Sequence, residues 1–165
     1  CDMTMLAPGE ATDFEFHRKK RQERGVQPHR VSENLEAAKK RFRLAPEQPC
    51  ENRYLMDYMA FHSMKEVNEG WVWKFDPRIL GPEEERGPDW WESLSDRFSG
   101  MQLPRAVIHG EHSNMFSPRV AEHIKSKSRG NIPMIQINDA HHHIMLDQPL
   151  AFAVAIDALL QSFMD

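Results

Sequence analysis

The alternation of apolar and polar residues changes near residue 100, so the two parts of the chain predict different structures. Beyond this point, short apolar runs alternate with amphipathic segments, a pattern typical of strands that alternate with helices. The predicted elements are strands at residues 105–110 and 132–137 and helices at residues 118–126 and 147–163. Apolar residues at helical spacing give the last helix a stripe suited to covering a sheet, formed by Phe152, Ile156, Leu159 and Phe163. We therefore expect alternating α/β structure from residue 101 onward.

The first hundred residues show helical spacing instead, interrupted by Pro, Gly and a stretch dense in Lys and Arg. The predicted helices span residues 13–24, 32–42, 51–62 and 89–98. Ser32 is expected to cap the second of them, because its hydroxyl can accept a hydrogen bond from a free backbone N–H. The segment 70–77 alternates like a short strand or an extended arm. Residues 8–100 are therefore predicted to form a mostly helical part with its connectors.

Composition and charge narrow the class of protein. With 165 residues, of which 40% are hydrophobic, the chain is long enough for one globular core. The formal net charge of −4 argues against a nucleic-acid partner, because phosphate binding depends on a clustered excess of Lys and Arg. The apolar run at residues 150–156 is too short to cross a bilayer. Cys1 and Cys50 neither require nor exclude a disulfide. We expect a cytoplasmic protein with no membrane partner.

Candidate chemistry is concentrated in residues 138–149, which read Asn-Asp-Ala-His-His-His-Ile-Met-Leu-Asp-Gln-Pro. A histidine on a short loop between a buried strand and an amphipathic helix suits acid–base work, because its backbone is anchored on both sides while its ring reaches the surface. The three consecutive histidines, together with His109 and His112, could also bind zinc. Adjacent side chains point in different directions, however, and no Cys or paired carboxylate completes a tetrahedral set. No metal is therefore predicted.

This segment resembles the histidine loop of the α/β-hydrolase superfamily, in which Gly-His is followed by a few apolar residues, an acidic residue, an optional Gln and a Pro. On that resemblance, His142 takes the position of the catalytic base, His141 stands where Gly is usual, and His143 is the neighbouring residue. The strand and helix units of residues 104–163 and the arm at residues 70–78 are also similar to members of this superfamily. No Gly-x-Ser-x-Gly occurs in the sequence, so the resemblance implies a nucleophile upstream.

The carboxylate that orients the histidine needs a separate argument. Most members carry it in a turn after the strand predicted at 105–110, where this chain reads Gly-Glu-His-Ser-Asn. Ser113 cannot hold a negative charge, and Asn114 can only act as a neutral acceptor. Some members carry the acid instead at the end of the sixth core strand, in a motif like Asp-x-Thr, which Asp2 and the two residues after it match. The resemblance therefore implies Asp2 as the acid, with Glu111 as the alternative.

The fold implied by the resemblance is the α/β-hydrolase fold, represented here by its C-terminal portion with a mostly helical cap. Residues 1–7 are expected to be the end of core strand six, residues 8–100 the cap and its connectors, and residues 101–165 the C-terminal part of the core. The nucleophile-bearing N-terminal half is expected to lie outside this chain and to be its partner, and a homodimer stays open as an assembly.

The implied activity is hydrolysis of an ester, thioester, amide or similar carbonyl substrate by the upstream nucleophile, with no cofactor. The expected partner is a small-molecule substrate whose identity the sequence does not give. Its predicted contacts are Trp71, Trp73, Phe116 and His143. The alternative function is a non-catalytic ligand-binding module on the same fold, which Ser113 and Asn114 at the usual place of the acid favour.

Overall fold

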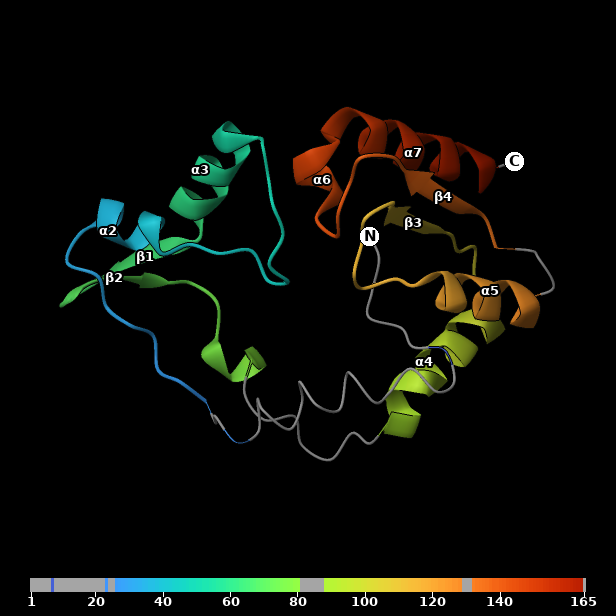
Figure 1. The fold of residues 1–165 in the computed structure, drawn as a ribbon, viewed down its shortest axis with the longest axis horizontal. Coiled ribbons are helices and arrows are strands. Elements are labelled where there is room, and N and C mark those ends of the chain that lie inside the picture. Colours follow the sequence, from blue (N-terminus) through green and yellow to red (C-terminus); the bar gives the residue numbers. More distant parts are fainter. Residues whose placement is uncertain (1–6, 8–22, 24–25, 81–87, 129–131, 165) are drawn as a thin grey trace. The chain divides into compact units, whose positions relative to one another are not determined.

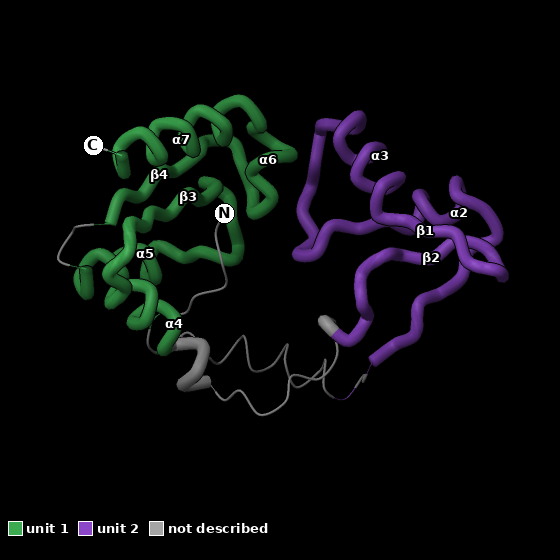
Figure 2. The backbone as a smooth tube through the Cα atoms, turned by 180° about the vertical axis from the view of Figure 1, so that it is seen from behind, with its two compact units in different colours: residues 1–14, 85–165 green, residues 15–84 purple. Residues whose placement is uncertain are grey.

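A computed structural model describes residues 7, 23, 26–80, 88–128 and 132–164, without the side chains of residues 79–80 and 88–92 (Figure 1). The chain divides into two compact units, coloured separately in Figure 2. Unit 1 is formed by residues 85–165 together with residues 1–14, and unit 2 by residues 15–84. None of the helices in the described ranges is long and apolar enough to cross a membrane.

Unit 1 contains a parallel pair of strands, β3 (Val107–Gly110) and β4 (Met134–Ile137). Its helices are α4 (Pro88–Gly100), α5 (Pro118–Lys127), α6 (Ile144–Asp147) and α7 (Pro149–Ser162). Helix α5 follows β3 and precedes β4, so the three elements form the crossover that a parallel pair requires. This arrangement confirms the alternating α/β structure predicted beyond residue 100.

The core of unit 1 lies on both faces of this sheet. Successive strand residues point to opposite faces, and Val107 and Ile108 accordingly belong to two different buried clusters. The first cluster contains Ala7, Val107, Phe116, Val120, Ile124 and Ile132, and the second Ile108, Ile137, Ala140, Ile144 and Ala155. Leu94 and Phe98 of α4 pack on the first cluster, whereas Phe152 and Leu159 of α7 pack on the second. Helices therefore cover both faces, as in other sheets with parallel strands (Figure 1).

Helix α4 packs within unit 1. It contacts α5 and the core cluster of unit 1, although residues up to 100 are predicted to belong to the cap. His123 of α5 also approaches Asp96 of α4, with 2.9 Å between Nε2 and Oδ1. By packing, the two compact units divide near residue 85. The assignment of residues 8–100 to a cap stays a prediction.

The C-terminal helix predicted at 147–163 corresponds to α7 (Pro149–Ser162), and a short helix that was not predicted, α6 (Ile144–Asp147), precedes it. Residue Gln148 separates α6 from α7 with backbone angles φ −131° and ψ 63°, which are not helical. The cause is Pro149, which has no N–H to donate and disfavours helical geometry in the residue before it. Of the four residues in the predicted apolar stripe, Phe152 and Leu159 pack on the core, whereas Ile156 and Phe163 are each 37% exposed. Ala155 faces the sheet instead.

Unit 2 is a small mixed α and β structure. Its elements are α2 (Leu35–Lys40), α3 (Arg53–His62), an antiparallel hairpin of β1 (Met64–Val67) and β2 (Gly70–Trp73), and a 3-10 helix at Pro77–Leu80. The helix predicted at 13–24 falls almost wholly outside the described residues. The sequence analysis predicted the strand at β2 and missed β1, so the part expected to be mostly helical also contains a hairpin.

Asn34, rather than the predicted Ser32, caps α2. The Asn34 side chain accepts a hydrogen bond from the backbone N–H of Ala37, over 2.9 Å. Ser32 instead pairs with Trp71 of β2 through two backbone hydrogen bonds of 2.8 Å. Gly70 permits this close pairing, because its φ is +136° and an added Cβ would lie 2.3 Å from the Ser32 carbonyl oxygen.

Candidate active site

The loops that follow β3 and β4 lie side by side at the carboxyl end of the two strands. The backbone N–H of Glu111 donates to the carbonyl of Ile137, and that of His112 to the carbonyl of Ala140, each over 2.9 Å. A Cβ on Gly110 would lie 2.3 Å from the carbonyl oxygen of His141 and 2.4 Å from that of Ala140. Glycine is therefore needed here for close approach, and the histidine loop rests directly on the end of β3.

A buried carboxylate closes the histidine loop. Asp147 has a side chain only 8% exposed, and its Oδ2 accepts a hydrogen bond from the backbone N–H of His141 over 2.7 Å. The same oxygen lies 3.1 Å from Nδ1 of the His141 ring. This pair was not foreseen in the sequence analysis, although Asp147 belongs to the motif that carried the resemblance. The bond spans six residues and so fixes the path of the loop through His142.

His142 lies in the middle of this loop, between the ring held by Asp147 and the start of α6. Its ring is partly buried, its Nδ1 atom is fully buried, and it packs edge-on against the ring of His143 with centroids 4.9 Å apart. His143 stands at the N-terminal boundary of α6. One ring nitrogen of His142 is therefore buried, and the residues on either side are positioned by Asp147 and by the start of α6. This geometry suits a positioned acid–base group.

The alternative acid, Glu111, is engaged elsewhere in the described structure. Its Oε2 accepts a hydrogen bond from the backbone N–H of Asp139 over 3.1 Å and lies 3.9 Å from Nε2 of His112. Asp139 has a positive φ of 52°, so Glu111 stabilises an unusual turn at the start of the loop. This contact gives Glu111 a structural role in the loop.

Ligand atoms of Glu111, His112 and Asp139 lie within 4.8 Å of one another, close enough to hold a metal ion. This group is not predicted from the sequence, because Glu111 and Asp139 follow two different strands. All three side chains are exposed, as in many solvated turns, and we assign no metal to them.

The two residues at the usual place of the acid form a turn. The Ser113 hydroxyl accepts a hydrogen bond from the backbone N–H of Met115 over 3.3 Å, and Asn114 is exposed. Asp2 lies outside the described residues. Ala7, at the end of the same predicted strand segment, is 3% exposed and belongs to the core cluster that contains Val107 of β3.

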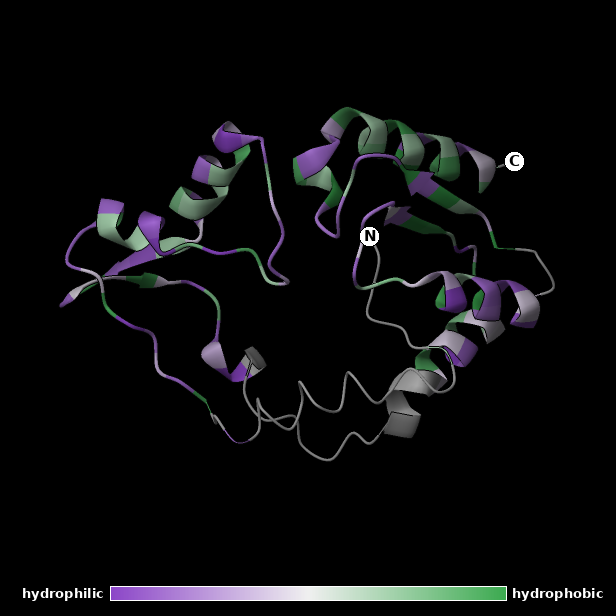
Figure 3. Cartoon of the chain, in the orientation of Figure 1, coloured by the Kyte–Doolittle hydropathy of each residue, from purple (hydrophilic) through white to green (hydrophobic). Residues whose placement is uncertain are grey.

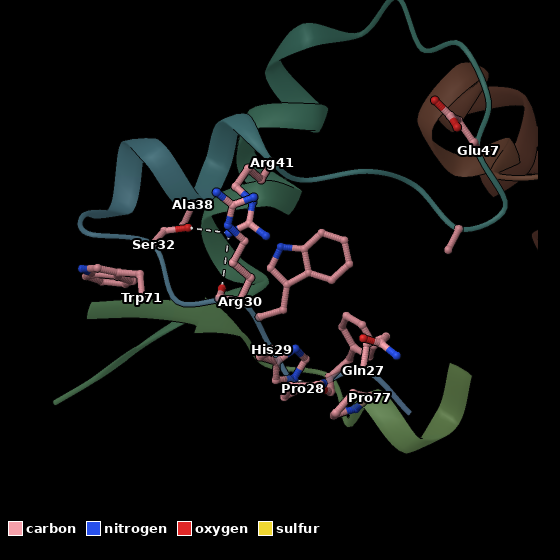
Figure 4. Close-up of a pocket in the computed structure, with 13 residues that line it drawn as sticks. Gln27, Pro28, His29, Arg30, Ser32, Ala38, Arg41, Glu47, Trp71 and Pro77 are labelled. Atoms are coloured by element: carbon pink, nitrogen blue, oxygen red, sulfur yellow. Dashed lines mark hydrogen bonds between the residues drawn. The ribbon is translucent and has the colours of Figure 1, made fainter. Parts of the chain in front are cut away.

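The predicted substrate contacts have different surroundings. Phe116 is 4% exposed in the core of unit 1, where its ring lies 4.9 Å from that of His109, and packing accounts for this position. Trp71 and Trp73 line a cavity of about 900 Å³ within unit 2 (Figure 4). Contact of these residues and of His143 with a substrate stays a prediction.

Comparison with known proteins gives matches among solved structures. No protein-family model and no curated protein sequence matches the chain. The structure of E-2-(acetamidomethylene)succinate hydrolase is similar, with 19% identity and a TM-score of 0.69 over 97% of this chain and 55% of that one. An esterase of Mycobacterium tuberculosis gives 16% identity and a TM-score of 0.69 over 96% and 52% of the two chains. An α/β hydrolase of Novosphingobium aromaticivorans gives 19% identity and a TM-score of 0.55 over 96% and 54%.

These matches define the class of fold. The chain has the α/β-hydrolase fold, as the histidine loop and the strand and helix pattern predicted. It spans about half the length of the solved structures it matches, in agreement with the predicted C-terminal portion.

Proposed function

We propose that this chain is part of a hydrolase that acts on an ester, thioester, amide or similar carbonyl substrate, with His142 as its general base. The observation that carries the proposal is the position of His142. It lies on a loop at the carboxyl end of parallel strands, with Nδ1 buried and the loop path fixed by Asp147. The fold supports it, since structures described as a hydrolase and an esterase share this fold. A fold alone does not define a reaction, so activity must be measured.

The proposed reaction is acyl transfer to a nucleophile supplied by the rest of the protein. Nε2 of His142 takes the proton of the nucleophile as it attacks the carbonyl carbon, and then gives that proton to the leaving group. Water, deprotonated by the same nitrogen, then attacks the acyl intermediate. The bond to the nucleophile breaks, the acid product leaves, and the ring returns the proton to the nucleophile. Asp2 is the proposed acid that accepts from Nδ1–H and stabilises the charged ring. Glu111 is the alternative, disfavoured by its contact with Asp139.

The test of this proposal is turnover of a p-nitrophenyl ester by the full-length protein. We expect hydrolysis, and we expect the change His142→Ala to abolish most of it. Tight ligand binding with no turnover in the wild-type protein would instead favour a non-catalytic binding module. Circular dichroism of the variant controls for loss of the fold.

The proposal also requires further chain, and unit 1 has surfaces suited to contact it. In the described part of the chain β3 pairs with β4 alone, and α7 exposes the apolar residues Leu150 (81%), Val154 (69%) and Leu160 (55%) (Figure 3). Open strand edges and apolar surfaces of this kind are typically covered by protein. The proposed partner is the remaining half of the fold. The 165 residues alone should then self-associate in sedimentation, and a compact, cooperatively melting monomer would contradict this.

A further inference from the structure

Unit 2 contains a cavity whose volume, about 900 Å³, is in the range of small-molecule sites. Three segments line it: residues 27–32, residues 38–47 around the end of α2, and residues 71–77 from β2 onward (Figure 4). All of them belong to unit 2, so the cavity is defined within this unit by itself.

One side of the cavity is aromatic. The ring centroids of Trp73 and Phe75 are 5.0 Å apart, and Phe42 supports Trp73 from a centroid distance of 6.0 Å. Trp71, Trp73 and Phe75 are only partly buried and line the cavity, so a ligand there would contact them. His29 is held against Phe75 by a contact of 2.5 Å between its Nε2 and the Phe75 carbonyl oxygen. These rings form a rigid surface on which a flat apolar group can stack.

The guanidinium of Arg41 is positioned at the same cavity. Its Nη1 donates to the hydroxyl of Ser32 over 3.1 Å and to the carbonyl of Arg30 over 3.3 Å, as the dashed lines of Figure 4 show. Ser32 is itself buried and fixed by its pairing with Trp71. In the described part of the chain, no hydrogen bond of Arg41 uses Nε or Nη2. With respect to the described residues, Nε and Nη2 are therefore available to bind an oxyanion of a ligand.

Charge at this cavity is predominantly positive. Both acceptors of Arg41 are neutral, and among the described residues neither Arg30 nor Arg41 forms an ion pair with a carboxylate. Glu47 also lines the cavity but lies well apart from Arg41 (Figure 4). The nearby carboxylate of Asp76 is neutralised by Arg78, whose Nε lies 2.9 Å from Oδ2. These hydrogen bonds from Arg78 lower the pKa of Asp76 to about 2.

We propose that this cavity binds a small aromatic carboxylate, with its ring against Trp73 and Phe75 and its carboxylate on the guanidinium of Arg41. The aromatic rings and the Arg41 guanidinium line the same cavity. A ligand that contacts both needs a flat apolar group to stack on the rings and an oxyanion to accept a bidentate hydrogen bond from Arg41. The proposal concerns binding in unit 2 and does not depend on the hydrolase reaction.

The test is isothermal titration calorimetry of the full-length protein with 2-naphthoate and with the neutral 2-naphthamide. The two probes have the same ring system and differ in charge. We expect naphthoate to bind at least about tenfold more tightly, because a hydrogen bond to a charged group contributes that much. The change Arg41→Gln should remove this preference. The matched control is Arg43→Gln, because Arg43 contacts only the nearby carbonyls of Lys40 and Phe42 among described residues and does not line the cavity.

A second variant keeps the test decisive if Arg41→Gln disturbs the pairing of Ser32. Trp73→Leu should weaken naphthoate about tenfold while the preference for the charged probe persists. Equal binding of naphthoate and naphthamide, an unchanged preference in Arg41→Gln, or no binding of naphthoate at millimolar concentration would each overturn the proposal. Hydrolysis is not measured in these titrations, so their failure is separate from failure of the proposed hydrolase function.

Discussion

The histidine loop of unit 1 and the cavity of unit 2 are built in different ways. The loop is held by main-chain contacts and one buried carboxylate, with Gly110 beneath it and Asp147 closing it. The cavity is formed by side chains from three separate segments around one guanidinium. A proton-transfer group must be held within a few tenths of an ångström, whereas stacking and charge recognition tolerate looser placement. This difference agrees with the two proposals, which assign proton transfer to the loop and ligand binding to the cavity.

The largest effect expected from this comparison distinguishes the three neighbouring histidines. The change His142→Ala should lower kcat/KM by roughly three orders of magnitude or more, because no other group replaces the base. The changes His141→Ala and His143→Ala should cost less than about tenfold, because the backbone bond to Asp147 persists without the His141 ring. Initial rates of p-nitrophenyl ester hydrolysis measure this series. An equal loss in His141→Ala would make His141 and Asp147 the reacting pair.

The next effect separates the two candidate acids. The change Asp2→Asn should lower kcat by roughly two to four orders of magnitude with KM nearly unchanged, because the acid fixes the tautomer and charge of the ring rather than binding substrate. Glu111→Gln should change kcat by less than about tenfold, since the amide oxygen can still accept from Asp139 N–H. Steady-state kinetics of both variants provide the comparison. The reverse order would identify Glu111 as the acid.

The presence of the histidine loop could be predicted from the sequence, whereas the cavity could not. The residues of the loop are consecutive, but those of the cavity are far apart in the chain. The loop motif lies within twelve consecutive residues, and the strands before it are short, mostly apolar runs. The Asp147 contact was still missed, since no residue pattern tells whether a motif carboxylate faces the backbone or solvent. The cavity is lined by residues up to fifty positions apart, among them Trp71 and Trp73 of β2. The strand that pairs with β2, β1, has the sequence Met-Lys-Glu-Val, which lacks a strand pattern. These residues form a strand because they pair with β2 in the hairpin.

A pair of glycine substitutions tests how much a close backbone contact contributes to the stability of each unit. Gly110→Ala places a Cβ against two carbonyl oxygens of the histidine loop, and Gly70→Ala does the same at Ser32 with an unfavourable φ of +136°. Each should lower the free energy of unfolding by roughly 2–4 kcal/mol, because backbone must shift to relieve the contact. Gly100→Ala is the matched control, since a Cβ there meets nothing within 4 Å. Urea denaturation should leave Gly100→Ala within about 1 kcal/mol of the wild type.

These substitutions also test the independence of the units. Gly70→Ala should weaken binding of 2-naphthoate more than ester hydrolysis, because it disturbs the pairing of Ser32 with Trp71 beside Arg41. Gly110→Ala should have the opposite selectivity. If each variant lost naphthoate binding and ester hydrolysis to the same extent, the loop and the cavity would not act as separate sites.

The smallest effect concerns the ion pairs between α4 and α5 of unit 1. Asp96 Oδ1 lies 2.9 Å from His123 Nε2 and 3.5 Å from Lys127 Nζ, and the hydrogen bond from His123 is the main cause of a lowered pKa at Asp96. A carboxyl group with a lowered folded-state pKa stabilises the fold above its ordinary value of 3.8 and loses this contribution as pH falls through the folded value. Because Asp96 is largely exposed, Asp96→Asn should cost only about 0.5 kcal/mol at pH 7.

The pH dependence distinguishes this ion pair from a general effect of surface charge. The difference in unfolding free energy between the wild type and Asp96→Asn should shrink as the pH is lowered below 3.8 and Asp96 becomes protonated. Glu122→Gln is the control on α5. The Glu122 side chain is 76% exposed and pairs with Lys125 one turn away on the same helix. A pair of this kind typically contributes about 0.3–0.5 kcal/mol to the free energy of unfolding. Urea denaturation monitored between pH 3 and 7 measures both variants. A difference for Asp96→Asn that stays constant over this range would mean that its carboxylate charge does not hold α4 against α5, leaving the apolar contacts of Leu94 and Phe98 to do so.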